Sequence, residues 1–326
     1  MLRLITGVGY LLAGAGLWMA PSFSRREYFF AVRVPEGFRR SSEAPRAVRE
    51  YRAVVLAAVS VGLCAHLAVP LRTLAWVAPI ASLVTLLIAG LAFYWQHRRL
   101  KPMAVLAVHA REAELTGQPE RLPWFAWLGT GPLLLIAAAA VFLYLNWDSI
   151  PARFPVHYAA HGQPNRWATR SVKGVYGPLL FGAELSVFLA VIGLATWYGS
   201  RRSSMRRFVL GILVCSEYLL STLLTMIVLQ PMLRLPIIWV YVLILCFIIP
   251  MVIATVKESN QPRDAPDPTP DDCWKGGLFY YNPNDAALCV EARTGFGVAY
   301  NFANPWIWGL LAALVLLVAS AFFVLP

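Results

Sequence analysis

Two histidines, His157 and His161, lie four residues apart in a polar segment at 148–175. On a helix this spacing places both imidazoles on one face, where they could bind a single metal ion. Zinc usually takes a third protein ligand, and Asp148 is the only acidic residue of the segment. Breaker residues directly after His161 would end any such helix there. Two alternatives stay open, a metal site and histidines that hydrogen-bond within the loop; we favour the second and expect no cofactor.

A second pair of ionisable residues, Glu184 and Glu217, lies well inside two long apolar runs. A charged side chain near the mid-plane of a bilayer costs at least ~2.5 kcal/mol, so such positions are functional candidates by default. If the two carboxyl groups face each other, they would share a proton and could couple transport to protons or cations. Alternatively, each is neutral and hydrogen-bonded to a nearby serine: Ser186, Ser216 or Ser221.

Eight apolar stretches must position these residues. They cover 2–20, 52–70, 73–96, 124–147, 176–198, 208–230, 235–256 and 305–325, and each can cross a hydrocarbon core of ~30 Å. The chain is 59% hydrophobic and 14% charged, with a mean hydropathy of +0.60, which excludes most soluble enzymes. Transmembrane β-strands would alternate apolar and polar residues, and these runs do not. We predict an all-α polytopic membrane protein with about eight transmembrane helices.

The basic residues are distributed unevenly between the two sides. If the N-terminus lies outside, only seven of the 28 lysines and arginines fall in outer segments: Arg3, Arg72, Arg153, Arg166, Arg170, Lys173 and Arg234. The positive-inside rule then predicts that both termini lie outside. The net charge of +11 therefore reports topology, and we expect no nucleic-acid partner.

The same pattern predicts how the chain is organised. Residues 1–123 form a three-helix membrane region with basic cytoplasmic loops, and 124–256 form a four-helix region that contains the outer loop. A linker rich in proline and aspartate follows at 257–272. Residues 273–304 predict a small β-rich cytoplasmic module with strands at 278–281, 287–292 and 297–302, too small to form its own core. The last helix is at 305–326.

Two further features concern the first region. Segment 21–51 is rich in arginine and aromatic residues, which favours either an interfacial segment that touches anionic headgroups or a plain basic loop. Residues 41–45 (SSEAP) are typical of a helix start that continues into the second span. His66 lies near the outer end of that span, where we expect it to reach the membrane interface.

The part of the chain from about 130 to 195 resembles the signature of SdpI-type membrane proteins, in which a patterned loop lies between two spans. The matching residues are Ile150, Pro151, Pro155, His157, Gly162, Pro164, Trp167 and Lys173, followed by Gly177 and Pro178. Asn165 departs from the pattern, since the family usually has aspartate there. A role that needs a negative charge at this position is not carried over.

This resemblance implies a multi-pass protein of the bacterial plasma membrane with an immunity-like function. The named member of the family protects its producer from a secreted, membrane-active peptide toxin and relays the presence of the toxin to a repressor. The implied partners are the lipid bilayer, such a peptide or toxin, and a cytoplasmic regulator. The implied binding residues are His157, His161, Gly162, Pro164, Asn165, Trp167 and Lys173. The chain has eight predicted spans, whereas that immunity protein has six.

The module at 273–304 is similar to a small domain of unknown function that accompanies SdpI-type loops in many bacterial membrane proteins. The residues that carry this similarity include Trp274, Tyr281, Asn282, Asp285, Arg293 and Asn301. Cys289 stands where related sequences tend to have apolar or aromatic residues, so we expect no catalytic cysteine.

No GxSxG, Walker or GxGxxG motif and no paired acids on the outer loop support an enzyme. We therefore predict a non-enzymatic protein whose outer loop recognises or sequesters a membrane-active peptide. The first alternative is a proton- or ion-coupled transporter that uses Glu184 and Glu217. The second is a membrane-embedded metal-dependent hydrolase with His157 and His161 as ligands.

Overall fold

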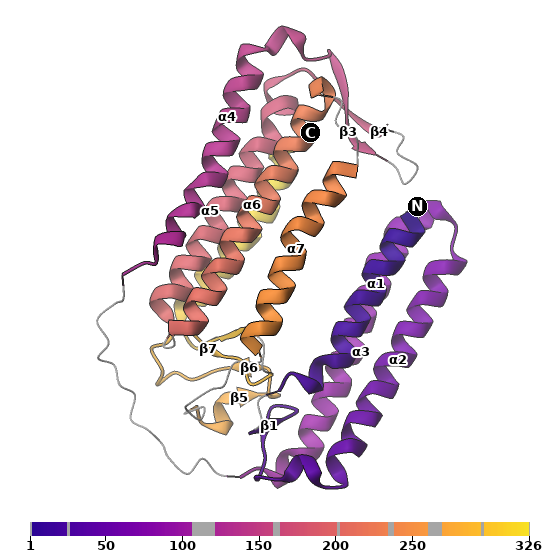
Figure 1. The fold of residues 1–326 in the computed structure, drawn as a ribbon, viewed down its shortest axis with the longest axis vertical. Coiled ribbons are helices and arrows are strands. Elements are labelled where there is room, and N and C mark those ends of the chain that lie inside the picture. Colours follow the sequence, from indigo (N-terminus) through magenta and orange to yellow (C-terminus); the bar gives the residue numbers. More distant parts are fainter. Residues whose placement is uncertain are drawn as a thin grey trace. The chain divides into compact units, whose positions relative to one another are not determined.

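The computed structural model describes residues 2–24, 27–105, 121–158, 164–200, 203–233, 238–259, 269–294 and 297–325. The chain is mostly helical in these ranges, with short strands between the helices (Figure 1). It divides into two compact units. Unit 1 comprises Met1–Ala113, Pro262–Tyr281 and Glu291–Ala299, and unit 2 comprises Glu114–Gln261, Asn282–Val290 and Tyr300–Pro326.

Three long helices form the body of unit 1: α1 (Leu2–Met19), α2 (Glu43–Ala68) and α3 (Leu71–Leu100). Short 3-10 turns at Ala20–Ser22, Phe38–Arg40, Lys101–Met103 and Asp271–Cys273 complete it, together with the strands β1 (Tyr28–Phe29), β2 (Val32–Arg33), β5 (Trp274–Lys275) and β6 (Phe279–Tyr280). The helix start predicted at 41–45 is confirmed, because α2 begins at Glu43 and continues into the second apolar run.

Three aromatic residues of segment 21–51, Tyr28, Phe29 and Phe30, are buried, so the expectation that these rings touch lipid headgroups is wrong. β1 and β2 form a hairpin whose two turn residues, Phe30 and Ala31, have positive φ angles of 47° and 60°. The Phe30 ring packs on Tyr51 and Phe93, with ring centres 5.5 and 5.2 Å apart. Burial of these rings against α2 and α3 offsets the cost of left-handed backbone at two residues with side chains.

His66 is fully buried inside the protein, so the prediction that its side chain reaches outward to the membrane interface is wrong. Its Nε2 lies 2.7 Å from the hydroxyl of Thr6 on α1, and its ring stacks on Tyr10. The Tyr10 hydroxyl lies 2.7 Å from that of Thr85 on α3. A polar cluster therefore joins the three helices, as expected where buried polar side chains need partners.

Unit 2 contains α4 (Gly131–Leu145), α5 (Val172–Gly199), α6 (Ser203–Leu233), α7 (Ile238–Ser259) and α8 (Pro305–Val324). α5 packs against α6, α4 and α8, and α6 also packs against α4 and α7. Between α4 and α5 lie a 3-10 turn at Trp147–Ser149 and the strands β3 (Arg153–Tyr158) and β4 (Pro164–Thr169).

The predicted span at 124–147 is not one continuous α-helix. Its first third, Trp124–Thr130, is a 3-10 helix named η4, and α4 begins only at Gly131. Pro132 lies in the first turn of α4, where the missing N–H is tolerated. A Cβ at Gly131 would overlap the hydroxyl of Tyr218, so the glycine allows η4 and α4 to approach α6 closely.

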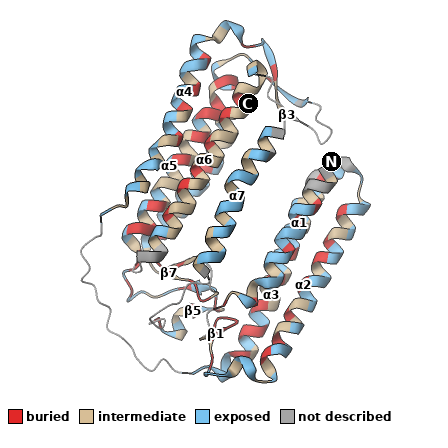
Figure 2. Ribbon diagram, in the orientation of Figure 1, coloured by how far each residue is buried: buried red, intermediate tan, exposed pale blue. Residues whose placement is uncertain are grey.

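Six helical segments of the described chain are long and apolar enough to cross a membrane: Glu43–Ala68, Trp76–Met103, Trp124–Leu145, Val172–Gly199, Arg206–Leu233 and Pro305–Val324. The chain is thus a multi-pass, membrane-type helical protein. α1 and α7 are helices at two further predicted spans, and their passage through a membrane stays a prediction. No described residue of α7 is buried (Figure 2).

In the described ranges the strands form four two-stranded sheets, β1–β2, β3–β4, β5–β6 and β7–β8, where β7 is Cys289–Glu291 and β8 is Val298–Tyr300. Each of the three strands predicted in the module at 273–304 contains an observed strand, and β5 is additional. The strands are shorter than predicted because glycine turns and asparagine turns take up the rest of the segment.

Candidate functional site

The β3–β4 hairpin is fixed to the helices of unit 2 by an apolar base. Phe154 and Ala168, which face each other in the antiparallel register, are both buried. They join a core cluster that also contains Ile150 and residues of three helices: Ile136, Ala139, Leu143, Val175, Leu179 and Val228. The hairpin is therefore mounted on α4, α5 and α6 by its own side chains.

Arg170 closes the base of the hairpin. Its guanidinium donates to the backbone carbonyls of Trp147, Asp148 and Ile150 at 3.2, 3.0 and 3.2 Å. Directly after it, the Ser171 hydroxyl caps α5 by accepting from the Gly174 N–H at 3.0 Å. These bonds tie the loop after α4 to the start of α5, so the hairpin has a fixed base.

The outward face of the hairpin is aromatic and cationic. Trp167 is 45% exposed, and the Arg153 guanidinium lies over its ring at 5.5 Å from the centre. Pro164, Arg166 and Lys173 are also exposed. A half-exposed tryptophan stacked with arginine is a pattern enriched at binding surfaces.

The structure corrects the helical arrangement considered for the two histidines. His157 lies in strand β3, opposite Arg166, because Pro155 favours extended backbone and Phe154 turns toward the core. His161 and Gly162 lie outside the described residues, and so do the side chains of His157 and Asn165. No group of three or more His, Cys, Asp or Glu suited to a metal ion occurs in the described part of the chain. The metal site and the hydrolase built on it stay predictions.

The two intramembrane glutamates lie in different surroundings. Glu184 is half-buried and its Oε2 accepts from the Ser320 hydroxyl of α8 at 2.6 Å. Glu217 is 1% exposed, and its Oε2 has no hydrogen-bond partner. This oxygen lies 3.1 Å from the place that a Cβ would take at Gly129 of η4.

The serines proposed as partners of the glutamates bond elsewhere. The hydroxyls of Ser186, Ser216 and Ser221 each donate to a backbone carbonyl one turn earlier in their own helix. Glu184 instead uses Ser320, which is 136 residues away in the sequence. Glu217 is the described glutamate whose burial is uncompensated, which singles it out.

Asn301 organises the part of the module that belongs to unit 2. It is fully buried; its side-chain oxygen accepts from the Asn282 N–H at 2.9 Å, and its amide donates to the Asn282 and Asp285 carbonyls at 2.9 Å. The Asp285 carboxylate accepts from the Ala287 N–H. These three residues stabilise the turn that the sequence reads as Asn-Pro-x-Asp, so their demonstrated role is structural.

Arg293 organises the part of the module that belongs to unit 1. It is 2% exposed and lies between the rings of Tyr28 and Trp274, at 4.8 and 4.9 Å from their centres. It also pairs with Asp271 at 2.6 Å and donates to the Thr269 carbonyl. Tyr281 is 48% exposed and lies outside this cluster. The module residues predicted from sequence therefore separate into two clusters.

Cys289 is not set up as a nucleophile. It is fully buried beside Ser200, and burial raises the pKa of its thiol to about 11. A thiol with this pKa is protonated at neutral pH and weakly reactive.

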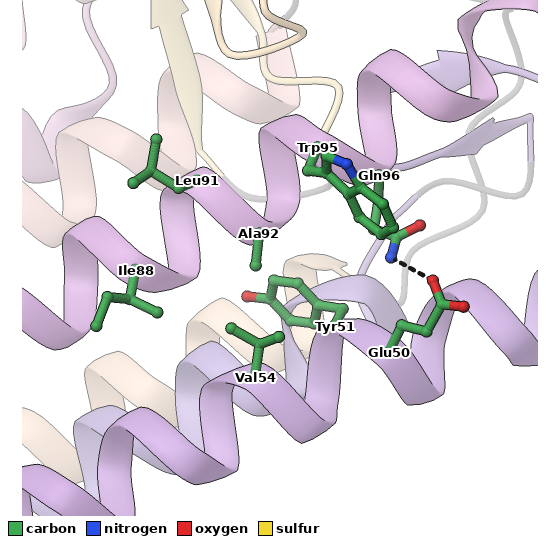
Figure 3. Close-up of a pocket in the computed structure, with 8 residues that line it drawn as sticks. All are labelled: Glu50, Tyr51, Val54, Ile88, Leu91, Ala92, Trp95 and Gln96. Carbon is green, nitrogen blue, oxygen red and sulfur yellow. Dashed lines mark hydrogen bonds between the residues drawn. The ribbon is translucent and has the colours of Figure 1, made fainter.

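A polar network between α2 and α3 was not predicted from the sequence. The Glu50 carboxylate accepts from Gln96 at 3.1 Å (Figure 3). It also accepts from Arg99 at 2.8 Å. Arg99 also pairs with Glu43 at 2.9 Å. A carboxylate and an arginine in two neighbouring apolar helices are a signal that could have indicated it.

Comparison with known sequences places one domain on this site. A family described as a domain of unknown function (DUF1648) matches residues 134–181. That range runs from α4 through the β3–β4 hairpin into α5, inside the part of the chain that carries the SdpI-type resemblance. No curated protein and no solved structure matches the chain. The SdpI-type assignment itself stays a prediction.

Proposed function

We propose that this chain is an SdpI-type, immunity-like protein of the bacterial plasma membrane, and that its β3–β4 hairpin recognises a membrane-active peptide outside the cell. In this proposal all eight apolar helices span the bilayer and both termini lie outside. The uneven distribution of lysine and arginine supports this orientation, since it leaves the hairpin on the side poorer in basic residues.

The observation that carries the proposal is the Trp167–Arg153 pair on a hairpin with a fixed base. Trp167 keeps 45% of its surface exposed although the neighbouring Ala168 is buried. A rigid aromatic side chain loses little conformational entropy when it binds, which suits a recognition residue. The apolar Val172, at the start of α5, is 72% exposed.

The sheet offers a second element of recognition. β3 and β4 pair only with each other among the described strands, so each has a backbone edge available to an extended peptide. Pro155 and Pro164 lack an N–H, which limits bonding along these edges and disfavours unspecific strand pairing.

The module before α8 supplies a site for a cytoplasmic regulator in the same proposal. Phe279 and Tyr281 are 56% and 48% exposed next to the Arg293–Trp274 cluster of unit 1. Exposed aromatic residues on a small module suit contact with a partner protein.

Cells that express the chain test the proposal when they are challenged with a panel of membrane-permeabilising peptides. We expect the wild type to raise survival against at least one peptide, and Trp167→Ala to lose most of that protection at an equal membrane level. Trp306→Ala is the matched control, since Trp306 is 77% exposed on α8. Protection by Trp167→Ala equal to that of the wild type would contradict the proposal, as would a wild type that protects against none.

A transporter that uses Glu217 is the second candidate function. Its carboxyl group is buried without a partner for Oε2, whereas Glu184 is paired with Ser320. A buried carboxyl group of this kind, next to a 3-10 helix, suits the exchange of a proton or the binding of a cation.

Proton flux into proteoliposomes under an imposed potential tests this candidate. We expect Glu217→Gln to abolish the flux and Glu184→Gln to keep most of it. Equal loss of flux in both variants would contradict a special role of Glu217. The absence of flux in the wild type would contradict the transporter hypothesis.

A further inference from the structure

A cavity of 320 Å³ lies on one side of α2, near the helix start. Its lining, drawn from the described residues, contains three arginines and no acidic side chain: Arg39, Arg49 and Arg52. Apolar walls come from Phe29, Pro45 and Val48. The cavity belongs wholly to unit 1.

The helical spacing explains why no acid lines the cavity. Pro45, Val48, Arg49 and Arg52 follow an i, i+3, i+4, i+7 pattern and so share one face of α2. The acids Glu43 and Glu50 lie on another face, where both pair with Arg99 of α3. Figure 3 shows that other face, with Glu50 directed toward Gln96. The acids of α2 are thus engaged away from the three arginines.

Two of the arginines are held in position by the backbone around them. Arg39 donates to the carbonyls of Ser24 and Tyr28 at 3.1 and 2.9 Å. Arg52 donates to the Trp18 carbonyl at 3.3 Å and to the Ser22 hydroxyl at 2.9 Å. Bonds to carbonyl and hydroxyl oxygens fix the direction of a guanidinium. The fold therefore holds the guanidinium groups of Arg39 and Arg52 in place.

The third arginine, Arg49, is exposed, as Arg39 is. It lies one turn before Arg52 on the same face and can turn toward an anion in the cavity. A guanidinium donates two parallel N–H groups to a phosphate, a geometry that lysine cannot reproduce.

The surroundings of the cavity suit a position at the level of lipid headgroups. Trp18, at the end of α1, is 39% exposed, and the Arg52 guanidinium lies 3.9 Å from the centre of its ring. Tryptophan is enriched where a membrane helix meets the interface. Val48 beside the arginines provides an apolar wall suited to the first carbons of an acyl chain.

We propose that this cavity binds the phosphodiester headgroup of an anionic phospholipid. The inference is independent of peptide recognition by unit 2. It requires that one phosphate approaches all three guanidinium groups while the lipid tail runs along the apolar surface of α2. Clusters of basic residues at the inner end of a membrane helix recognise anionic lipids by the same chemistry.

Native mass spectrometry of the full chain in detergent tests the proposal, with phosphatidylglycerol, phosphatidylcholine and inorganic phosphate as separate probes. We expect Arg49→Gln to weaken the first bound phosphatidylglycerol about fivefold, the share of one basic residue near an anionic headgroup. Arg46→Gln is the matched control, because Arg46 pairs with Glu50 on the other face of α2. It should bind this lipid as the wild type does.

The other two probes decide whether the cavity binds a lipid headgroup or free phosphate. Phosphatidylcholine should bind both arginine variants and the wild type alike, and millimolar inorganic phosphate should not displace phosphatidylglycerol. Equal weakening by Arg49→Gln and Arg46→Gln would overturn the site, since it would indicate unspecific attraction to basic residues. Displacement by inorganic phosphate would overturn the lipid assignment. Arg49 is exposed, so unchanged thermal stability of Arg49→Gln confirms that the fold is intact.

Discussion

The hairpins β1–β2 and β3–β4 are built from similar residues and have opposite exposures. Both combine arginines with aromatic side chains in a segment next to an apolar helix. In β1–β2 the rings of Tyr28 and Phe30 are fully buried, whereas in β3–β4 Trp167 is 45% exposed. Arginine contacts an aromatic ring in both hairpins, Arg33 over Tyr28 and Arg153 over Trp167.

The difference arises from what each hairpin packs against. The turn of β1–β2 enters the core of unit 1, where the Phe30 carbonyl lies 2.9 Å from Nδ1 of His97. β3–β4 packs on its helices only through its base, by Phe154, Ala168 and the bonds of Arg170. Composition alone therefore does not separate a structural hairpin from a recognition surface; the position of the buried residues does.

Among the variants that test this comparison, we expect Phe30→Ala to reduce stability most. Removal of a buried ring costs about 3–5 kcal/mol, because transfer free energy and packing are both lost. Thermal unfolding in detergent should show a strongly destabilised protein. Phe323→Ala is the control, since Phe323 is 77% exposed on α8 and should change stability little. A Phe30→Ala protein as stable as the wild type would contradict the buried turn.

Arg170→Met should have the next largest effect. The variant loses the charged donor of three backbone carbonyls, and we expect a cost of about 2 kcal/mol. Arg166→Met on the exposed face of β4 should stay within about 0.5 kcal/mol of the wild type. Hydrogen exchange of residues 153–169 should accelerate in Arg170→Met and stay unchanged in Arg166→Met. Equal exchange in the two variants would show that Arg170 does not fix the hairpin.

We expect Ala31→Gly to change stability least, in contrast to the same substitution at Ala47. Relief of the positive φ at Ala31 is worth about 1 kcal/mol, which offsets about 0.8 kcal/mol for the lost buried methyl group. We therefore expect nearly unchanged unfolding. Ala47→Gly, at an equally buried position inside α2, should cost about 1 kcal/mol or more. Similar losses in the two variants would contradict the left-handed turn.

The helices were largely predictable, because long apolar runs dictate them in a membrane. The helix start before the second span was also readable from residues 41–45. The break between η4 and α4 was missed, although Gly131 and Pro132 were visible in the sequence. A continuous run of apolar residues is compatible with a 3-10 helix and with an α-helix, so the apolar pattern could not distinguish the two.

The candidate site was predictable in place and only partly in geometry. The outer loop, Trp167 and its neighbours were selected from sequence, yet the strand at His157 was not, because two histidines four apart fit a helix better. The partners of His66 and Glu184 are Thr6 and Ser320, 60 and 136 residues away. No local pattern contains such contacts, so tertiary packing alone decides them.

Photo-crosslinking tests most directly whether the β3–β4 hairpin is a recognition surface. The full chain, reconstituted in phosphatidylglycerol nanodiscs, would carry p-benzoylphenylalanine in place of Trp167 or, as the control, of Trp306, which is even more exposed. The probe is a permeabilising peptide against which the wild type protects cells. Crosslinking of this peptide from position 167 and not from position 306 is the predicted result. Equal crosslinking from both positions, or none from position 167, would contradict the account.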